Sequence, residues 1–493
     1  MGSSAKRSRR QQNELSPDAR RWRVLAVLLT AIFMSLIGVS IVNVALPSIQ
    51  EALGASQSDL QWVLSGYALT FGVVLVGAGR AGDLMGRGGF FLIGVALFTV
   101  ASIAAGLAPD ANWLNGARFV QGIGSGLVNP QGIGMIQHYF RGAERGRAFG
   151  YLGTAVGFSV AIGPVLGGFL IELGGLELGW RLTFLVNVPI GIATIILGLM
   201  WFPRPLITRP IPQAPPVVPA NRTMPSPGFA AATQHPTGRV PRRLKPRVPR
   251  KPAHGLRSLD PIGSLLLGLS VLFVLFPFVE ARSEPITWAL LPLGLALSWM
   301  WVKWEQRYAR LGLSPMVDLE IFSTSSFANG TIIMTLYFLG MTSVWVLVAL
   351  YVQQGAGKTA LESGLFGIPA ALLSAYAANW AGKRVMRYGR KVVIGGLLLA
   401  IFGLASSIAV VLLHEHGDLS IWWLLLSLSF IGIAQGSVIS PNQALTLADV
   451  PLDYAGSSGA IMQTGQRIGT SVGIAVITAA VFATLSVTSW SNA

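Results

Sequence analysis

Thirteen long apolar stretches are the feature that most limits what this chain can fold into. Each is close to the roughly twenty residues that a helix needs to cross the hydrocarbon layer of a bilayer. They lie at 24–47, 60–80, 89–107, 112–138, 146–172, 181–202, 262–280, 286–304, 327–352, 363–382, 391–413, 420–440 and 457–486. One soluble core could not bury so many runs, so the sequence predicts an all-α integral membrane protein.

Composition agrees with this prediction and excludes several functions. Hydrophobic residues make up 52% of the 493 residues and charged residues only 11%, whereas a soluble domain carries about 25% charged residues. The chain has no cysteine, which excludes disulfides and thiolate chemistry. Its five histidines lack the spacing of a metal site, apart from a weak pair at His414 and His416. We therefore expect no metal, no cofactor and no enzymatic activity.

The basic excess, 36 Lys and Arg against 20 Asp and Glu, would suggest a nucleic-acid partner in a soluble protein. Here the cations gather in alternate loops while the other loops are mainly acidic, which is the positive-inside pattern. We expect membrane lipids as partners and no nucleic acid. The basic N-terminus is then cytoplasmic, and the run after it is a retained first span rather than a signal peptide. The acidic internal loop at 449–453 goes against the pattern.

The pattern divides the chain into five segments: a basic N-terminus at 1–23, a helical bundle at 24–202, a linker at 203–258, two inserted helices at 259–304 and a second bundle at 305–493. The linker holds fourteen of the 28 prolines and no acidic residue. Such a segment cannot bury enough apolar surface to fold, so we expect it to be disordered. It is either a tether to lipid or a partner, or a tolerated insertion.

An internal repeat relates the two bundles. The motif Gly-x6-Gly-Arg follows the second span of each bundle, beginning at position 79 and again at position 382. Parallel repeats of this kind are typical of transporters with a substrate site between the repeats. We expect two pseudo-symmetric bundles of six-helix type, the second lacking its last helix. With the two inserted helices this makes about thirteen transmembrane helices.

Charged residues within or beside spans are the first functional candidates. An arginine at the bilayer centre costs at least about 2.5–3.5 kcal/mol, so Arg118 and Arg467 must each face a partner or a wet cavity. We expect them to control a proton or substrate site; the alternative is a structural arginine satisfied by carbonyl groups and water. In the loop after the second span, Asp83 and Arg87 are either a latch that holds one conformation closed or ordinary loop charges.

Polar and aromatic side chains within spans are candidates for a substrate path: Asn43, Tyr67, Gln121, Trp345, Gln435 and Gln463. The amides could instead bond only to neighbouring helices, and tryptophans often anchor at the membrane interface. The fifth span has a nearly bare face and a proline kink at Gly163, Pro164, Gly167 and Gly168. It suits a helix about which two halves rock, or else close static packing.

These motifs resemble the major facilitator superfamily, and within it the fourteen-spanner drug:H+ antiporter family. The resemblance runs from about residue 22 to 484 and rests on 41–47 (IVNVALP), Gly79, Asp83, Gly86, Arg87, Arg118, Gln121, Gly122, the 163–168 run and 187–191 (NVPIG). It implies export of amphipathic, often cationic, compounds across a bacterial cytoplasmic membrane by alternating access, with protons flowing inward. It also implies that Arg118 couples protons and that 163–168 is the antiporter signature.

The sequence departs from the family pattern in two places. Gly38 stands where the family usually carries an aspartate, and no sixth helix of the second bundle is seen. Proton transfer through a dry barrier needs a titratable group, and no Asp or Glu lies near the middle of any span, so the sequence does not support coupling by a carboxylate. A binding site for cations would also lack its buried anion, which favours a neutral, anionic or lipid-like substrate. We expect a secondary active, multidrug-type exporter of small amphipathic compounds. The alternatives are a proton-independent or lipid-like substrate transporter, and a transport-inactive scaffold whose linker holds partners.

Overall fold

The computed structural model describes residues 17–207, 260–279, 285–311, 313, 315–358 and 360–485. Within these ranges the chain forms thirteen α-helices and no β-strand. The helices are α2 (Pro17–Leu53), α3 (Gln57–Met85), α4 (Arg87–Gly106), α5 (Ala111–Tyr139), α6 (Gly142–Leu185), α7 (Asn187–Trp201), α8 (Pro261–Val279), α9 (Leu290–Arg310), α10 (Ser325–Leu350), α11 (Ala360–Tyr388), α12 (Arg390–Glu415), α13 (Leu424–Thr446) and α14 (Ala455–Leu485). The expectations for the first sixteen residues, for 208–259 and for the chain after Leu485 lie outside the described residues.

Local sequence explains where several helices begin and end. Helix α3 starts with a capping box, in which the Asp59 amide donates to Ser56 Oγ (3.1 Å) and the Ser56 amide donates to Asp59 Oδ2 (2.9 Å). Asp110 caps α5 by accepting from the Trp113 amide at 2.8 Å. The second glycine of each repeat motif turns the chain between two helices with a positive φ, 108° at Gly86 and 56° at Gly389.

The thirteen helices confirm the predicted all-α class and match the thirteen apolar runs. The fifth and sixth runs meet inside α6, where the backbone of Gly175 leaves the helical conformation (φ 63°, ψ −163°). The fifth span therefore occupies the first part of α6, and the sixth combines its last part with α7.

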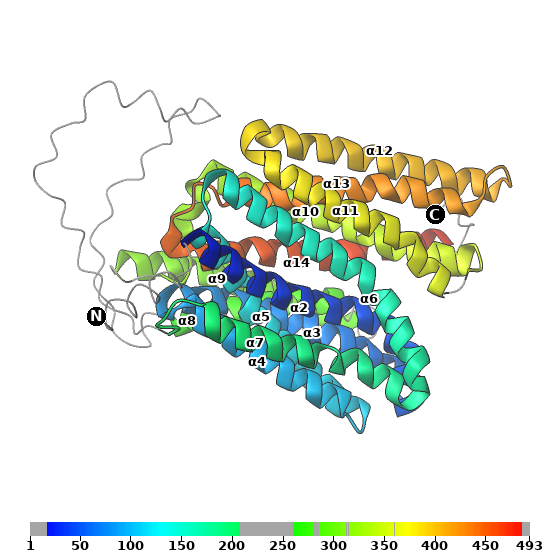
Figure 1. Cartoon of the computed structure of the whole chain (residues 1–493), viewed down its shortest axis with the longest axis horizontal. Coiled ribbons are helices and arrows are strands. Elements are labelled where there is room, and N and C mark those ends of the chain that lie inside the picture. Colours follow the sequence, from blue (N-terminus) through cyan, green and yellow to red (C-terminus); the bar gives the residue numbers. More distant parts are fainter. Residues whose placement is uncertain are drawn as a thin grey trace, which may run out of the picture.

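Two helical bundles with an inserted pair make up the architecture (Figure 1). Helices α2 to α7 form the first bundle and α10 to α14 the second. Helices α8 and α9 pack on each other, and α8 packs against α3 and α14. The bundles meet where α6 packs on α11 and where α14 packs on α3 and α5. One helix of each bundle, α6 or α14, thus packs against the other bundle, and the two contacts are related by the pseudo-symmetry.

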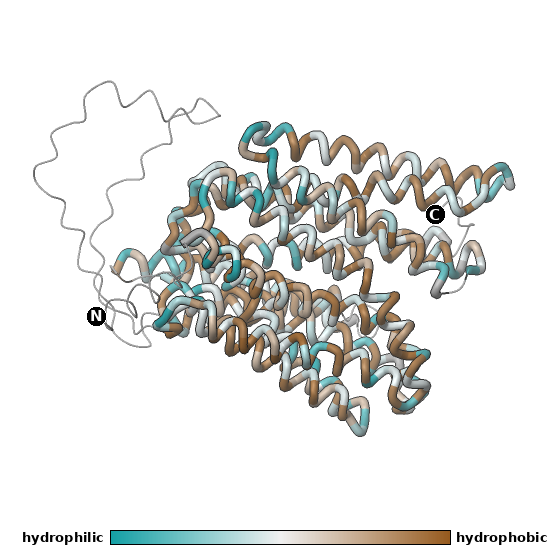
Figure 2. Tube along the Cα trace, in the orientation of Figure 1, coloured by the Kyte–Doolittle hydropathy of each residue, from teal (hydrophilic) through white to brown (hydrophobic). Residues whose placement is uncertain are grey.

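Nine helical segments of the described chain are long and apolar enough to cross a membrane, and one of them, at 142–201, spans both α6 and α7. Hydrophobic residues recur along the helices, and hydrophilic residues gather mainly near the helix ends (Figure 2). Helices α5, α11 and α14 lie outside the nine, and each packs against a helix of the other bundle. Polar side chains are tolerated there because they face protein rather than lipid.

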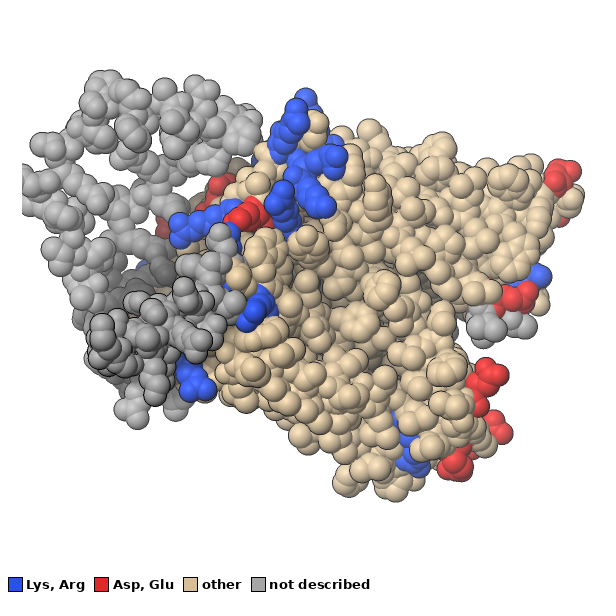
Figure 3. Space-filling view, viewed as in Figure 1, with Lys and Arg blue, Asp and Glu red and all other residues tan. Residues whose placement is uncertain are grey.

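The two ends of the bundles differ in charge. We call the end where α7 finishes and α8 begins the linker end, and the opposite end, which includes 107–110 and 416–420, the far end. On the face shown in Figure 3, lysine and arginine gather mainly at the linker end, whereas acidic residues dominate the far end. The outline is also indented between the two bundles at the far end.

Candidate functional site

Asp83 joins the two bundles at the linker end. Its carboxylate is fully buried, and Arg87 Nε and Nη2 donate to Oδ1 at 3.0 and 2.8 Å. The Gly456 amide donates to Oδ1 at 2.9 Å, and the amide and hydroxyl of Ser457 donate to Oδ2 at 2.9 and 2.8 Å. Both residues belong to the first turn of α14, whose free amides and dipole favour a negative charge. One carboxylate therefore binds an arginine of its own bundle and a helix of the other.

Further contacts surround this carboxylate. Arg87 Nη2 also donates to the carbonyl of Leu452 at 2.8 Å, and Gln137 Nε2 donates to the carbonyl of Ala455 at 2.9 Å. The backbones approach so closely that a Cβ on Gly79 would lie 2.8 Å from the carbonyl oxygen of Gly456. The contact between α3 and the start of α14 thus depends on charge, hydrogen bonds and the absence of a side chain.

The second contact between bundles, α6 against α11, is built from small residues. A Cβ on Gly157 would lie 3.0 Å from the carbonyl oxygen of Ala371, and one on Gly382 would lie 2.5 Å from the carbonyl oxygen of Gly146. Thr154 Oγ1 donates to the carbonyl of Ala375 at 2.9 Å. Like the bonds at α14, this one lies in the linker-end half of the molecule, so the described hydrogen bonds hold the bundles together on that side.

The predicted moving helix faces two neighbours. A Cβ on Gly163 would contact Ser40 of α2, and one on Gly167 would lie 2.9 Å from Ile41. Pro164 faces α11, where a Cβ on Gly364 would lie 3.8 Å from its ring, and the space at Gly168 is open. The bare side of α6 therefore packs on its own bundle, while the proline faces the other.

Arg118 is buried in the first bundle without an acidic partner. It is 1% exposed; Nε donates to the carbonyl of Val63 at 2.7 Å and Nη1 donates to Gln121 Oε1 at 2.8 Å. Gln121 Nε2 in turn donates to Ser102 Oγ at 2.7 Å. The oxygen and the nitrogen of the Gln121 side-chain amide are thus both hydrogen-bonded. The Arg118 guanidinium lies over the ring of Tyr67, 4.5 Å from its centroid.

Tyr67 begins a row of groups that ends at Arg467, the other candidate arginine within a span. The rings of Tyr67 and Phe71 stack with centroids 6.3 Å apart, and Arg467 from α14 lies over Phe71 at 4.5 Å. The Tyr67 hydroxyl donates to Ser125 Oγ at 2.8 Å. Among the described residues, no carboxylate forms an ion pair with Arg118 or Arg467. The row therefore carries two positive charges that only rings, carbonyls and an amide compensate.

The remaining candidates are spread over four helices. Asn43 is exposed on α2, and Gln435 is half-buried on α13. Trp345 on α10 packs against a hydrophobic cluster that includes Tyr351. Gln463 lies on α14, one turn before Arg467, and its Oε1 is buried without a hydrogen-bond partner in the described chain. The structure thus groups Arg118, Tyr67, Gln121 and Arg467, but it shows no direct contact of Asn43, Trp345 or Gln435 with them.

The structure also shows the surroundings of Gly38, the position at which the family usually carries an aspartate. A Cβ on Gly38 would lie 3.3 Å from the ring of Phe98 and 3.7 Å from Asn187 Nδ2. Gly38 therefore faces the interior of the first bundle, and its bare backbone provides room for Phe98.

Two buried acids were missed from the sequence. Asp260, at the start of α8, accepts from the Gly263 amide (3.0 Å) and Trp304 Nε1 (2.9 Å). Glu305 on α9 is 1% exposed, and a Cβ on Gly263 would meet both carboxylates. The apolar run of this span ends at 304, one residue before Glu305. The neighbouring Trp301 and Trp304 were the available signal that the helix, and its packing, continue.

The chain is similar to known proteins over nearly its whole length. Residues 28–474 match the model of the Major Facilitator Superfamily. The "Probable actinorhodin transporter" of Streptomyces coelicolor is 31% identical over 468 residues, which cover 94% of this chain and 72% of that protein. The "Multidrug resistance protein Stp" of Mycobacterium tuberculosis is 27% identical over 95% of this chain and 78% of its own length. The crystal structure of the human organic anion transporter MFSD10 (TETRAN) has a TM-score of 0.61 at 14% identity, covering 92% of both chains.

Proposed function

The chain belongs to the major facilitator superfamily, a family of multi-pass membrane transporters, and from that premise we propose that it exports small amphipathic compounds across a bacterial cytoplasmic membrane by alternating access. One observation carries the proposal: the Asp83 carboxylate holds α14 of the other bundle at the linker end, while the outline is indented between the bundles at the far end (Figure 3). This is the arrangement of a transporter closed on one side.

The linker end is the cytoplasmic side in this proposal. Loops at that end carry most of the cations of the described chain, and the positive-inside rule places such loops in the cytoplasm. The structure would then be closed to the cytoplasm, and the Asp83 contact with α14 must break for a substrate to enter from inside. Asp83 and Arg87 are the latch, and α6, which touches both bundles, is the helix that moves.

The charge of the central row favours neutral or anionic substrates over cationic ones. Arg118 and Arg467 bring two positive charges to the interior, without an acidic partner among the described residues. Burying a cationic substrate beside these two charges would cost free energy because like charges repel in a medium of low dielectric. Gln121 is already bonded at both ends, so we assign it to positioning Arg118. We assign the substrate path to two groups of side chains. Asn43 and Tyr67 belong to the first bundle, and Trp345, Gln435 and Gln463 belong to the second.

Transport by purified protein in liposomes tests this function. The probe is a fluorescent planar aromatic compound prepared as its acid, its methyl ester and its amine. We expect the acid and ester to be moved and the amine to be excluded. Arg118→Ala should reduce the exclusion of the amine, whereas Arg310→Ala, which removes an exposed cation at the end of α9, should not. Failure of the parent protein to move any of the three would contradict the proposal.

A second candidate, transport without proton coupling, is favoured by the surroundings of Gly38. The family's usual aspartate is absent there, and the space that it would need is filled by Phe98 and Asn187. Transport rates measured with and without an imposed pH gradient separate the two. A rate that is unchanged by the gradient supports this candidate, and a rate that collapses with the gradient rejects it.

A further inference from the structure

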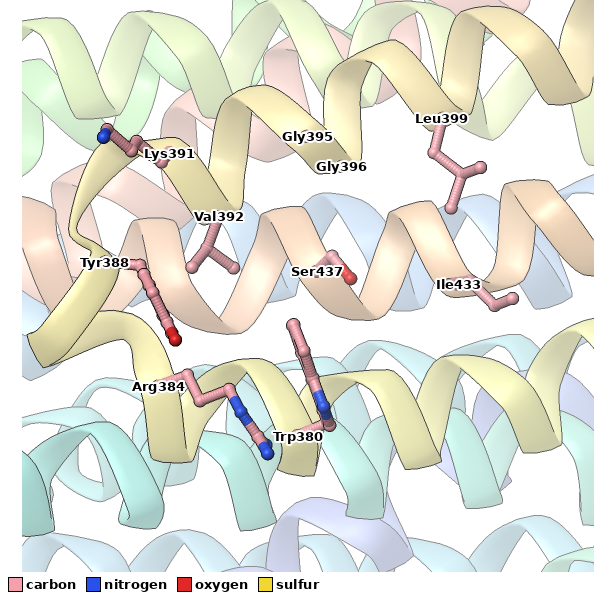
Figure 4. Close-up of a pocket in the computed structure, with 10 residues that line it drawn as sticks. All are labelled: Trp380, Arg384, Tyr388, Lys391, Val392, Gly395, Gly396, Leu399, Ile433 and Ser437. Atoms are coloured by element: carbon pink, nitrogen blue, oxygen red, sulfur yellow. The ribbon is translucent and has the colours of Figure 1, made fainter.

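A groove on the outside of the second bundle has no part in the proposed path. It is a cavity of about 470 Å³ between α11, α12 and α13 at the linker end (Figure 4). Its lining residues are Trp380, Arg384, Tyr388, Lys391, Val392, Gly395, Gly396, Leu399, Ile433 and Ser437. We propose that this groove binds one anionic phospholipid, with its phosphate between Arg384 and Lys391 and an acyl chain along Val392, Gly395 and Leu399.

The chemistry of the groove changes along its length. Arg384, Tyr388 and Lys391 lie at the end next to the turn between α11 and α12, whereas Leu399 and Ile433 lie at the other end (Figure 4). A ligand that fills the groove therefore needs a negative polar group at one end and an apolar chain at the other. In a membrane protein, the ligand of that form that is always present is a lipid.

The charge around the mouth is of one sign. Five cations lie between positions 383 and 391, namely Lys383, Arg384, Arg387, Arg390 and Lys391, without an acid among them. Figure 3 shows this patch of blue where α11 turns into α12. In the described part of the chain, no carboxylate pairs with any of the five. Basic pockets between transmembrane helices on the cytoplasmic side are suited to anionic lipid head groups.

Aromatic side chains place the mouth of the groove at the membrane surface. The Arg384 guanidinium lies over the ring of Trp380 at 4.5 Å, and Arg387 lies over Tyr388 at 5.4 Å. Trp380 and Tyr388 are 42% and 45% exposed, as expected for residues of the interfacial aromatic belt. The stacking holds Arg384 beside the groove, where its planar fork is available to a phosphate.

Because Gly395 has no side chain, the groove stays open at this position. Gly395 has nothing within 4 Å of the position that a Cβ would take, although Gly396 beside it packs tightly on Ser437 and Val438. Its neighbour Ile394 is 55% exposed on the outer surface of the same helix. The alternative is that the five cations only set the membrane topology through their charge. That role needs no empty space at Gly395. A binding site needs that space, which makes the two explanations separable.

Native mass spectrometry of the full chain tests the proposal. The protein in detergent is mixed with phosphatidylglycerol, or with phosphatidylcholine of the same acyl chains, and the lipid that stays bound after the detergent is removed in the spectrometer is counted. We expect one retained phosphatidylglycerol and no retained phosphatidylcholine. Arg384→Gln/Lys391→Gln should weaken phosphatidylglycerol binding about 30-fold, as for two cations lost at a lipid surface. Lys383→Gln/Arg387→Gln, which removes the same charge outside the lining, should weaken it less than threefold. Gly395→Leu should block binding with the charge unchanged, whereas Ile394→Leu should not.

Several results would overturn the proposal. One is equal weakening by the two double substitutions, which would show that loop charge alone attracts the lipid. Another is full binding by the Gly395→Leu protein when its unfolding temperature matches that of the parent. Displacement of the lipid by millimolar glycerol phosphate would show that the site recognises a free phosphate. The variants are compared by unfolding temperature first, and the charge substitutions decide the matter if Gly395→Leu does not fold. Because the groove is outside the proposed path, failure here would leave the proposed function standing.

Discussion

The two turns of the internal repeat have the same glycine spacing but do different things. In the first, at 79–87, Asp83 reaches across to α14; in the second, at 382–390, the corresponding position is Met386. The backbones are packed alike, since Gly79 lies against Gly456 and Gly382 lies against Gly146 and Gly150. The shared glycines thus bring helices of opposite bundles together in both halves, and the acid is what differs.

The partner helices differ as well. Helix α14 begins at Ala455, so the amides of Gly456 and Ser457 are free to bind a carboxylate. Helix α6 begins at Gly142, two turns before Gly150, so the amides at the matching position are already used inside the helix. A latch of this kind requires an acid on one bundle and a helix that starts opposite it on the other. The second half of the molecule has neither, and its basic turn lies instead beside the proposed lipid groove.

The largest effect is expected from Asp83→Asn. It removes the ion pair with Arg87 and the charge at the start of α14. Hydrogen bonds to charged groups contribute about 1.5–3 kcal/mol, so closure at the linker end should weaken by about tenfold or more. Initial transport rates in liposomes should fall accordingly. Asp110→Asn is the matched control, because asparagine also caps a helix and Asp110 does not join the bundles. Equal rates for the parent and Asp83→Asn would contradict the latch.

Gly79→Ala and Gly382→Ala should have the next largest effects, and the two should be similar. Each added methyl group would press on the backbone of the other bundle, at 2.8 Å from Gly456 O and 2.5 Å from Gly146 O. Overpacking of this kind costs about 1–3 kcal/mol, which should lower the unfolding temperature and the transport rate. Gly340→Ala, where nothing lies within 4 Å, is the control. A large effect at only one of the two glycines would break the pseudo-symmetry argued above.

Met386→Asp tests whether the acid alone makes a latch. We expect no rescue when it is combined with Asp83→Asn, because α6 offers no free amides there. A carboxylate in this half-buried position should instead destabilise the protein by about 1–3 kcal/mol, as measured by thermal unfolding. Restored transport in the double variant would show that the helix start is unimportant.

The smallest effect is expected from Gln137→Ala. Its amide donates one hydrogen bond to the carbonyl of Ala455 beside the latch, and a neutral hydrogen bond contributes about 1 kcal/mol. We expect the transport rate to change severalfold, much less than for Asp83→Asn. This result would show that the charged contacts of the latch contribute more to closure than the neutral one. An effect as large as that of Asp83→Asn would show that the Gln137 side-chain amide stabilises closure as much as the Asp83 carboxylate does.

Much of the fold could be predicted from the sequence because apolar runs of membrane length specify helices directly. The break between the fifth and sixth runs, where Gly175 leaves the helical conformation, and the repeat at 79 and 382 are local patterns. The partner of Asp83 was not, because Gly456 lies 373 residues away and only the fold brings α14 to the turn. The burial of Glu305 could not be predicted for a related reason, since the start of α8 packs against it and its own helix does not show this in sequence.

The interior of the site divides in the same way. Arg118 was recognised from its cost within an apolar span, but its partners, Val63, Gln121 and the ring of Tyr67, come from three-dimensional packing. Gln121 looked like a ligand group because a polar amide in a span needs a partner. The sequence could not show that Arg118 and Ser102 already supply both partners.

The most direct test of the account is a pair of distances measured by electron paramagnetic resonance in lipid nanodiscs. The chain has no cysteine, so nitroxide labels can be placed on exposed residues in pairs, at Ala143 and Ser325 on the linker end and at Asn112 and Asp418 on the far end. When Asp83→Asn is introduced, we predict that the linker-end distance lengthens and the far-end distance shortens. If both distances stay as in the parent protein, the two bundles do not rock about a latch at Asp83.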